Sequence, residues 1–219
     1  EKMSKSKFNV VNPDDICDQY GADTLRMYEM FLGPIEQSKP WSTRGISGVH
    51  SFLKKFWNLF FLNGNFNVSQ DDPSQESIKI LNQTIKKVTN DIEKFSLNTC
   101  VSSFMICVNK LSEEKCNNES VLKQLLILIS PFAPHFAEEL WSLMGNKESI
   151  VDEPFPIHDD SVLVEYQKAY PVSFNGKTKF TLSLSLDLSN KEIEKILLND
   201  NKTKKYLNNK KPKKVIIVK

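Results

Sequence analysis

Two lysines three residues apart carry the sharpest chemical signal in the sequence. Lys2 and Lys5 are interleaved with the hydroxyls of Ser4 and Ser6 close to the start of the chain. Phosphoryl and nucleotidyl transfer need positive charge where negative charge accumulates on phosphate oxygens in the transition state. A lysine on a mobile loop supplies such a charge as a point cation. By residue type alone, a solvated basic terminus is the commoner meaning of such a pentamer, so both interpretations stay open at this level.

A second concentration of positive charge lies at the other end of the chain. The 219 residues include 29 Lys plus Arg and 27 Asp plus Glu, for a net charge of +2. Eight of the lysines lie in residues 202–219, which contain no acid, so this segment carries +8 and the rest carries −6. The near-balance argues against a uniformly basic nucleic-acid binder. The asymmetry indicates a polyanionic partner contacted at one end, with a solvated lysine-rich face as the plainer alternative.

Short helices are predicted directly after the lysine-rich residues 1–12, which should form a loop. Asn12 is predicted to cap a helix that starts at Pro13 and ends at Gly21. Asp23 is predicted to cap a second helix, which ends at Gly33 and the proline after it. Residues 1–41 therefore form one predicted region.

Long amphipathic helices are predicted from residue 42 onward. Apolar residues recur at three- and four-residue spacing in five segments, which are Ile46 to Phe60, Ile78 to Phe95, Leu97 to Leu111, Leu122 to Ile129 and Phe136 to Leu143. This pattern predicts four to five antiparallel helices in a bundle over residues 42–151. Cys100 and Cys107 share a predicted helix face with apolar neighbours, which favours buried, reduced thiols and a cytoplasmic protein.

The hydrophobic period changes from 3.6 to 2 beyond Asp152. Apolar residues alternate with Thr and Ser from Phe180 to Leu186, and the preceding Asn175-Gly176 is a strong hairpin-turn signal. A helix capped by Ser189, a turn at Tyr206-Leu207 and a buried strand at 215–218 are predicted to follow. We expect a small α/β domain over residues 161–219, a linker over 152–160, and a mainly α protein overall.

Several other functions find no support in the residues. No apolar run of about 18 residues is present, so no membrane span is predicted. The four cysteines form no CxxC pair and the three histidines are scattered, so we predict no metal site. Glu138 and Glu139 are adjacent and would point about 100° apart on a helix, so they form no acid–base pair. His135, Trp41 and Trp57 are interpreted as structural residues.

The pentamer KMSKS matches the second signature of the class I aminoacyl-tRNA synthetases letter for letter. The longer segment KMSKSKFNVVNPDDICDQYGADTLRMYEMFLGPIEQSKPW resembles the leucyl-tRNA synthetases of the bacterial type, and YEMF followed by GP is not shared by the isoleucyl and valyl enzymes. Similar blocks follow in order: KFSLNTCVSSFMICVN, SPFAPHFAEELW, YPVSFNGKTKFTLSLSLD and KPKKVIIVK. The resemblance covers essentially the whole chain.

The resemblance implies the C-terminal part of an enzyme that activates leucine with ATP and Mg²⁺ and transfers it to tRNA(Leu). It implies that Lys5 is the catalytic residue, because in the family this lysine reaches the ATP phosphates as the leucine carboxylate attacks the α-phosphorus. Lys2, Met3, Ser4 and Ser6 would complete the ATP-binding loop. The bundle would correspond to the anticodon-binding-like domain of the class.

The resemblance also implies contacts with the tRNA backbone. The small terminal domain of the family touches the outer corner of the tRNA, and lysines suit phosphate contacts. The residues expected to bind tRNA are Arg26, Lys177, Lys179, Lys210, Lys211, Lys213 and Lys214. For Arg26, an ion pair with Glu29 on the same helix is an equal alternative.

The chain opens in mid-motif and lacks the family's upstream nucleotide-binding core, so we expect a fragment that is inactive by itself and monomeric. We expect the fragment to show no pyrophosphate exchange activity. Two alternatives stay open. A stand-alone RNA-binding module would be favoured by a reading frame that starts with Met and has no upstream core. A valyl, isoleucyl or methionyl relative would be distinguished by the amino-acid pocket.

Overall fold

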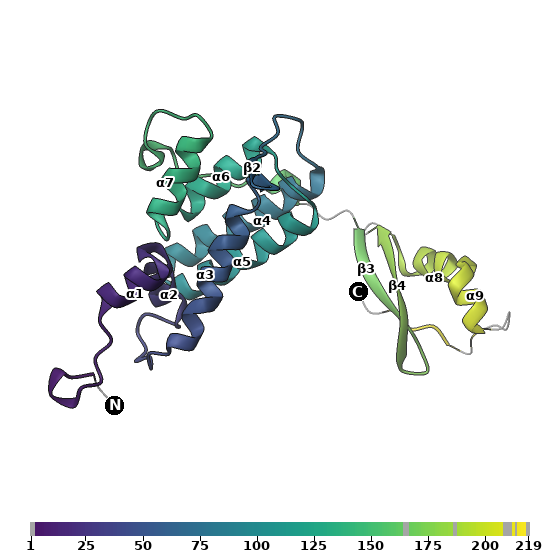
Figure 1. The fold of residues 1–219 in the computed structure, drawn as a ribbon. Coiled ribbons are helices and arrows are strands. Elements are labelled where there is room, and N and C mark those ends of the chain that lie inside the picture. Colours follow the sequence, from purple (N-terminus) through teal and green to yellow (C-terminus); the bar gives the residue numbers. More distant parts are fainter. Residues whose placement is uncertain (1–2, 164–166, 186–187, 208–211, 213, 218–219) are drawn as a thin grey trace. The chain divides into compact units, whose positions relative to one another are not determined.

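The computed structural model describes residues 3–163, 167–185, 188–207, 212 and 214–217, and it is drawn as a ribbon in Figure 1. The chain divides into two compact units, residues 1–163 and 164–219. Helices make up most of the first unit, and the described residues of the second unit form one hairpin and two helices. The predicted mainly α fold is confirmed.

The first two helices begin and end where local sequence signals place them. Helix α1 (Pro13–Tyr20) starts with the Asn12 side chain accepting a hydrogen bond from the Asp14 backbone N–H at 3.3 Å. It ends at Gly21, whose φ of +88° suits a residue without a Cβ atom. Helix α2 (Ala22–Phe31) packs on α1 and buries Met27 and Tyr28. Both predicted helices are confirmed.

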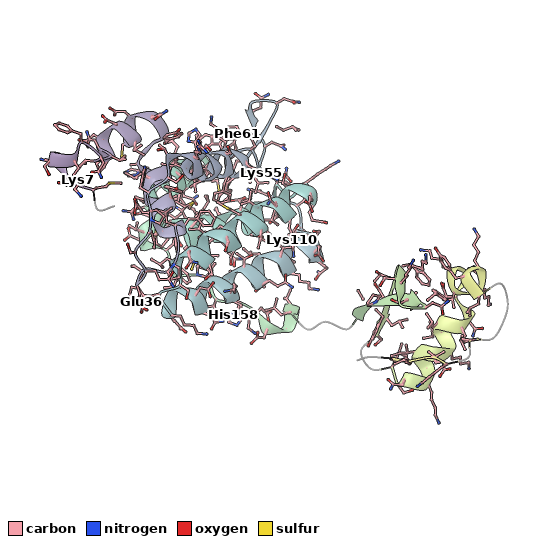
Figure 2. The ribbon with its side chains drawn as sticks, turned by 90° about the horizontal axis from the view of Figure 1, so that it is seen from below. Lys7, Glu36, Lys55, Phe61, Lys110 and His158 are labelled. Carbon is pink, nitrogen blue, oxygen red and sulfur yellow. The ribbon has the colours of Figure 1, made fainter. Side chains whose placement is uncertain are left out.

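A bundle of longer helices forms the rest of the first unit. Its members are α3 (Thr43–Trp57), α4 (Gln75–Glu93), α5 (Leu97–Glu113), α6 (Glu119–Ile129) and α7 (Pro134–Leu143). Phe56, Phe60, Phe104 and Phe132 are among its largest buried side chains. Side chains fill the space between these helices in Figure 2, on whose ribbons Lys55 and Lys110 are labelled. The predicted bundle is confirmed, and its apolar stripes form one core.

A short β-hairpin, whose two strands have two residues each, connects α3 to the loop before α4. Strands β1 (Phe61–Leu62) and β2 (Asn65–Phe66) pair antiparallel in this segment, for which the sequence patterns predict no strand. The Trp57 indole stacks on Phe61 with ring centroids 5.1 Å apart, and Trp41 contacts Tyr28 edge-to-face at 5.3 Å. Both tryptophans therefore pack against aromatic neighbours, as predicted.

Close packing of α2 on α3 makes Gly45 intolerant of a side chain. A Cβ atom at Gly45 would lie 2.6 Å from the Tyr28 hydroxyl, whereas one at Gly48 would meet nothing within 4 Å. Alanine favours a helix over glycine by up to about 1 kcal/mol, so Gly48→Ala should raise the free energy of unfolding. Gly45→Ala should instead lower it by about 1–3 kcal/mol through overpacking. Urea denaturation of the two variants checks this, and equal effects would contradict the packing.

Residues 152–160, predicted as a linker, pack against α4 in the structure. The Asp159 backbone N–H donates to Asn82 Oδ1 at 2.7 Å, and Lys86 Nζ lies 2.8 Å from Asp160 Oδ1. The hydrogen bond from Lys86 lowers the pKa of Asp160. Two 3₁₀ turns, η2 (Ile150–Asp152) and η3 (Asp160–Leu163), flank this segment. The division between the units therefore falls after Leu163, because the acids of this segment have partners on the bundle.

The second unit begins with the predicted β-hairpin. Strands β3 (Gln167–Phe174) and β4 (Lys177–Ser185) pair antiparallel, with a register shift between Val172 and Ser173. Asn175 and Gly176 form the turn, both with positive φ. The hairpin prediction is confirmed.

Two helices follow the hairpin, and here the structure corrects two predictions. Helix α8 (Asn190–Asn199) starts with a Ser189–Glu192 capping box, so its predicted cap is confirmed. Tyr206 and Leu207 end helix α9 (Asn201–Leu207) rather than forming a turn, because Asp200 Oδ1 accepts from the Thr203 N–H at 3.0 Å and starts a new helix. The predicted strand 215–218 is not formed over residues 215–217, where Ile216 is 73% exposed, and Val218 lies outside the described residues.

All four cysteines are free thiols. Burial raises the pKa of Cys100 and of Cys107 to about 11, so both are neutral at physiological pH. Over the described residues, no helix is long and apolar enough to cross a membrane, and no three His, Cys, Asp or Glu side chains gather as metal ligands.

Candidate functional site

The basic loop at the start of the chain is a compact turn. Residues Lys5–Lys7 form a 3₁₀ turn, in which the Lys7 N–H donates to the Ser4 carbonyl at 3.0 Å. The hydroxyls of Ser4 and Ser6 lie 2.7 Å apart. Lys5 and Ser6 are exposed, as is Met3, and Ser4 is half-buried. The loop therefore presents the Lys5 ammonium to solvent, on a backbone that local hydrogen bonds shape.

Asn9 closes this loop, a role that the sequence patterns did not predict. Its Oδ1 accepts a hydrogen bond from the Ser4 backbone N–H at 2.8 Å, which joins the two sides of the turn. Asn side chains often bond to nearby backbone groups, so an Asn five residues after Ser4 was the available signal. Lys2, the other lysine of the motif, lies outside the described residues.

Arg26 has a partner that neither sequence alternative named. Its Nη2 donates to the Pro131 carbonyl at 3.1 Å, in the turn between α6 and α7. One helical turn earlier, Asp23 accepts from His135 Nδ1 at 2.9 Å and from the Phe136 backbone N–H at 2.6 Å. Asp23 therefore caps α7 rather than its own helix, which corrects the prediction; α2 has no side-chain cap.

Glu138 and Glu139 lie beyond the first turn of α7, which contains no acidic residue. Glu138 Oε2 accepts instead from the Ser149 hydroxyl at 2.9 Å and from the Ile150 N–H at 3.2 Å. Glu138 thus has a structural role in joining α7 to the residues after it.

An aromatic cluster with lysines at its edge lies in the second unit. The Phe180 and Tyr206 rings are stacked with centroids 6.2 Å apart, and Phe174 lies 5.2 Å from Tyr206. Lys179 Nζ lies 5.8 Å from the centroid of the Tyr206 ring, and Lys202 Nζ lies 5.8 Å from that of Phe180. The fold therefore joins cations from β4 and α9 around one aromatic surface, on which Tyr206 is half exposed.

The other lysines expected to bind tRNA are only partly described. Lys177, at the start of β4, and Lys214 are exposed, like Lys179. Lys210, Lys211 and Lys213 lie outside the described residues. The structure thus brings Lys177 and Lys179 onto one strand.

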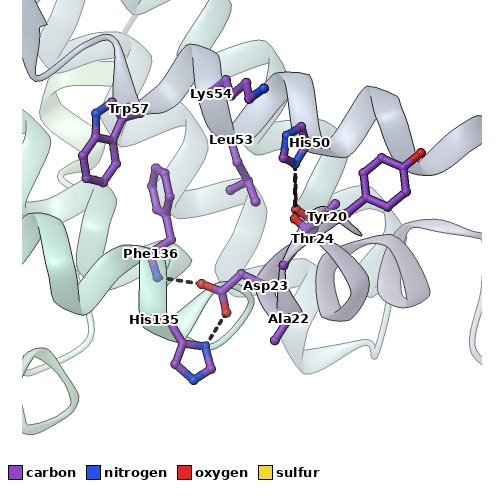
Figure 3. Close-up of a pocket in the computed structure, with 11 residues that line it drawn as sticks. Tyr20, Ala22, Asp23, Thr24, His50, Leu53, Lys54, Trp57, His135 and Phe136 are labelled. Carbon is purple, nitrogen blue, oxygen red and sulfur yellow. Dashed lines mark hydrogen bonds and ion pairs between the residues drawn. The ribbon is translucent and has the colours of Figure 1, made fainter. Parts of the chain in front are cut away.

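An open cavity of about 420 Å³ lies where the first helices meet the bundle. Its walls come from the end of α1, the start of α2, the α3 residues His50, Lys54 and Trp57, and the start of α7 (Figure 3). His50 Nδ1 lies 3.2 Å from the Tyr20 carbonyl and 3.4 Å from Thr24 Oγ1. These polar contacts join α3 to α1 and α2 in the wall of the cavity.

Two family profiles match the chain and define its class. The profile described as the anticodon-binding domain of tRNA ligase matches residues 75–216, and the profile described as tRNA synthetases class I (I, L, M and V) matches residues 1–41. The first match covers more than half of the chain. The chain therefore belongs to the tRNA ligases that carry this anticodon-binding domain.

Within that class, the relatives are leucine–tRNA ligases. The leucine–tRNA ligases of Flavobacterium psychrophilum and Christiangramia forsetii are 61% and 59% identical over 218 residues, which is 100% of this chain. This chain spans about 23% of the length of these curated relatives. The resemblance to leucyl-tRNA synthetases is confirmed along the whole chain.

A solved structure shows the same likeness. The leucyl-tRNA synthetase of Agrobacterium radiobacter K84, determined in a ternary complex with tRNA and LeuAMS, matches with a TM-score of 0.72 and 27% identity. The match covers 99% of this chain and 30% of the Agrobacterium chain. The fold described above is thus one that a leucyl-tRNA synthetase adopts.

Proposed function

We propose that this chain is the part of a leucine–tRNA ligase that supplies the mobile ATP-phosphate loop and the tRNA-binding surfaces. The full-length enzyme would activate leucine with ATP and Mg²⁺ and transfer it to tRNA(Leu), as a cytoplasmic monomer. The observation that carries the proposal is the identity of 52–61% to leucine–tRNA ligases over the whole chain. Homology to leucine enzymes also disfavours the valyl, isoleucyl and methionyl alternatives.

In this proposal, Lys5 stabilises charge on the ATP phosphates. As the leucine carboxylate attacks the α-phosphorus, negative charge builds on the phosphate oxygens and pyrophosphate leaves. An ammonium group that arrives with loop closure stabilises this transition state more than the bound substrates. The exposure of Lys5 supports this, because an exposed ammonium group is accessible to a phosphate. Lys2, Met3, Ser4 and Ser6 would shape the loop around ATP.

The tRNA would be held through its phosphates by lysines of the second unit. Lys177 and Lys179 on β4 are exposed, as is Lys214. Lys210, Lys211 and Lys213 lie with Lys214 in the basic segment of residues 202–219. Lysines around an aromatic surface suit RNA, since ammonium groups neutralise phosphates and ring faces accept unstacked bases. Arg26 would contribute to tRNA binding only if its bond to Pro131 leaves donors free for a phosphate.

Each region has a proposed role. Residues 1–41 would be the ATP loop and stem-contact region, 42–151 the anticodon-binding-like bundle, and 161–219 the tRNA-contacting terminal domain. The leucine pocket and the rest of the nucleotide-binding core would come from the remainder of the enzyme.

Charging of tRNA tests this proposal. The full-length enzyme, with ATP and Mg²⁺, should attach leucine to tRNA(Leu), whereas the 219-residue chain by itself should not. The second reaction should fail because, in this proposal, the leucine pocket comes from the remainder of the enzyme. Incorporation of radiolabelled leucine into acid-precipitable tRNA measures both. Binding of tRNA by a full-length protein without any charging would favour the RNA-binding module.

A further inference from the structure

Helix α2 holds the turn between α6 and α7 at two points that lie one helical turn apart. Asp23 is only 8% exposed, and its two carboxylate oxygens accept from His135 Nδ1 and from the Phe136 backbone N–H (Figure 3). Arg26 donates to the Pro131 carbonyl in the same turn. We call these contacts of Asp23 and Arg26 the α2 clamp.

The clamp supplies bonds that the turn cannot make by itself. Phe136 is the third residue of α7, and the first backbone N–H groups of a helix have no acceptor within it. A carboxylate at this position also interacts favourably with the positive end of the helix dipole. Hydrogen bonds with a charged donor or acceptor are about twice as strong as neutral ones. If α2 moved away, the Asp23 carboxylate and the Phe136 N–H would both lose this partner, so the contact opposes separation of α2 from α7.

A third contact fixes the far end of α2 to α3. The Tyr28 hydroxyl donates to the Ser42 carbonyl, and its ring packs against Trp41 and the Gly45 backbone. Helix α2 is therefore attached to both the start of α3 and the start of α7. Helix α1, which packs on α2, directly follows the loop that carries Lys5.

We propose that Asp23 and Arg26 are positioning residues that keep the bundle and the Lys5-bearing region in one alignment while leucine is transferred to tRNA. This inference rests on the proposed function. The bundle connects the ATP-binding region to the tRNA-contacting second unit along the chain, so the tRNA 3′ end would reach the activated leucine only when the bundle and the ATP-binding region keep a fixed relation. Misplacement by about 1 Å can cost about 10²-fold in rate. Adenylate formation needs no tRNA, so it should not depend on the clamp.

The test compares the two half-reactions in the full-length enzyme. Asp23→Ala and Arg26→Met should lower kcat for tRNA charging by about 10- to 100-fold. Leucine-dependent pyrophosphate exchange and the KM for tRNA should stay within about twofold, since the residues act after activation. Asp23→Asn keeps one acceptor oxygen and should recover part of the loss. Asp18→Asn, an exposed acid on α1, and Glu29→Gln, exposed on α2, are matched controls that should leave both reactions unchanged.

Hydrogen exchange reports on the clamp without any catalysis. The Phe136 amide should be protected in the wild type and should lose protection in Asp23→Ala, and unchanged protection would overturn the proposal. A parallel fall of exchange and charging would also overturn it, since that shows only a damaged fold. If Asp23→Ala fails to fold, Asp23→Asn and Arg26→Met still show whether tRNA charging falls while pyrophosphate exchange is kept.

Two further results separate competing accounts. A raised KM for tRNA and a flatter salt dependence in Arg26→Met alone would identify Arg26 as a phosphate contact and would overturn its clamp role. If the wild-type enzyme showed no leucine-dependent pyrophosphate exchange, the proposed function would be wrong. The variants are not needed to detect this result, so it is distinct from a failure of the clamp proposal.

Discussion

Replacing Lys5 with Ala in the full-length enzyme should lower leucine-dependent pyrophosphate exchange by about 10²- to 10³-fold, while leucine binding survives. A loss of this size corresponds to about 3–4 kcal/mol of transition-state stabilisation. The physical reason is that the ammonium group is needed only where charge builds on the phosphates. Exchange kinetics and the dissociation constant for leucine, measured separately, check the two halves of this statement.

The control for Lys5 is a lysine of similar exposure in another loop. Lys147 lies between α7 and η2 and is exposed, so Lys147→Ala removes the same charge far along the chain from the motif. It should leave exchange unchanged. Normal exchange in Lys5→Ala, or equal losses in both variants, would remove the catalytic role of Lys5.

Neutralising the basic residues of the second unit should weaken tRNA binding in a salt-dependent way. The triple change Lys177→Gln, Lys179→Gln and Lys214→Gln should reduce the slope of log K against log salt concentration by about one for each lysine that contacts a phosphate. The reason is that each lost contact releases one fewer condensed counterion on binding. Affinity of the full-length enzyme for tRNA(Leu), titrated over a range of salt concentrations, measures the slope. Removal of residues 210–219 should have the same direction of effect.

An equal charge change on the first unit serves as the comparison. Lys94, Lys110 and Lys147 are exposed there, and their replacement by Gln alters the net charge of the enzyme by the same amount. If the second unit holds the tRNA corner, this variant should keep the wild-type slope. Equal slope changes would indicate a general effect of net charge, and an unchanged slope in the first triple variant would place the RNA surface elsewhere.

Features set by neighbouring residues could be predicted from the sequence. The helix start at Asn12, the capping box at Ser189 and the hairpin turn at Asn175-Gly176 each depend on side chains within a few residues of the backbone groups they satisfy. The apolar stripes of the bundle were equally visible, because a period of 3.6 residues is a local property. The KMSKS pentamer is local in the same sense, although its match to the family signature, and not its residue types alone, indicates a phosphate-binding loop.

Features set by distant partners could not be predicted. Asp23 looks like a cap for its own helix, but its carboxylate bonds to a backbone N–H 113 residues away. The acids of residues 152–160 are typical of a linker, yet Asp160 pairs with Lys86, 74 residues earlier. Residues 215–217 have the β-branched character of a strand, but a strand needs a paired neighbour, and among the described residues of the second unit the ladder consists of β3 and β4 alone. Each of these features depends on a long-range partner, which a local rule does not take into account.

Charging of tRNA(Leu) by the full-length enzyme tests the central claim most directly. Leucine, isoleucine, valine and methionine are supplied in parallel reactions with ATP and Mg²⁺, and the amino acid attached to tRNA(Leu) is quantified. We predict that leucine is attached and that the other three stay at background. Attachment of another of these amino acids in place of leucine, or no attachment at all by an enzyme that still binds tRNA, would contradict the account.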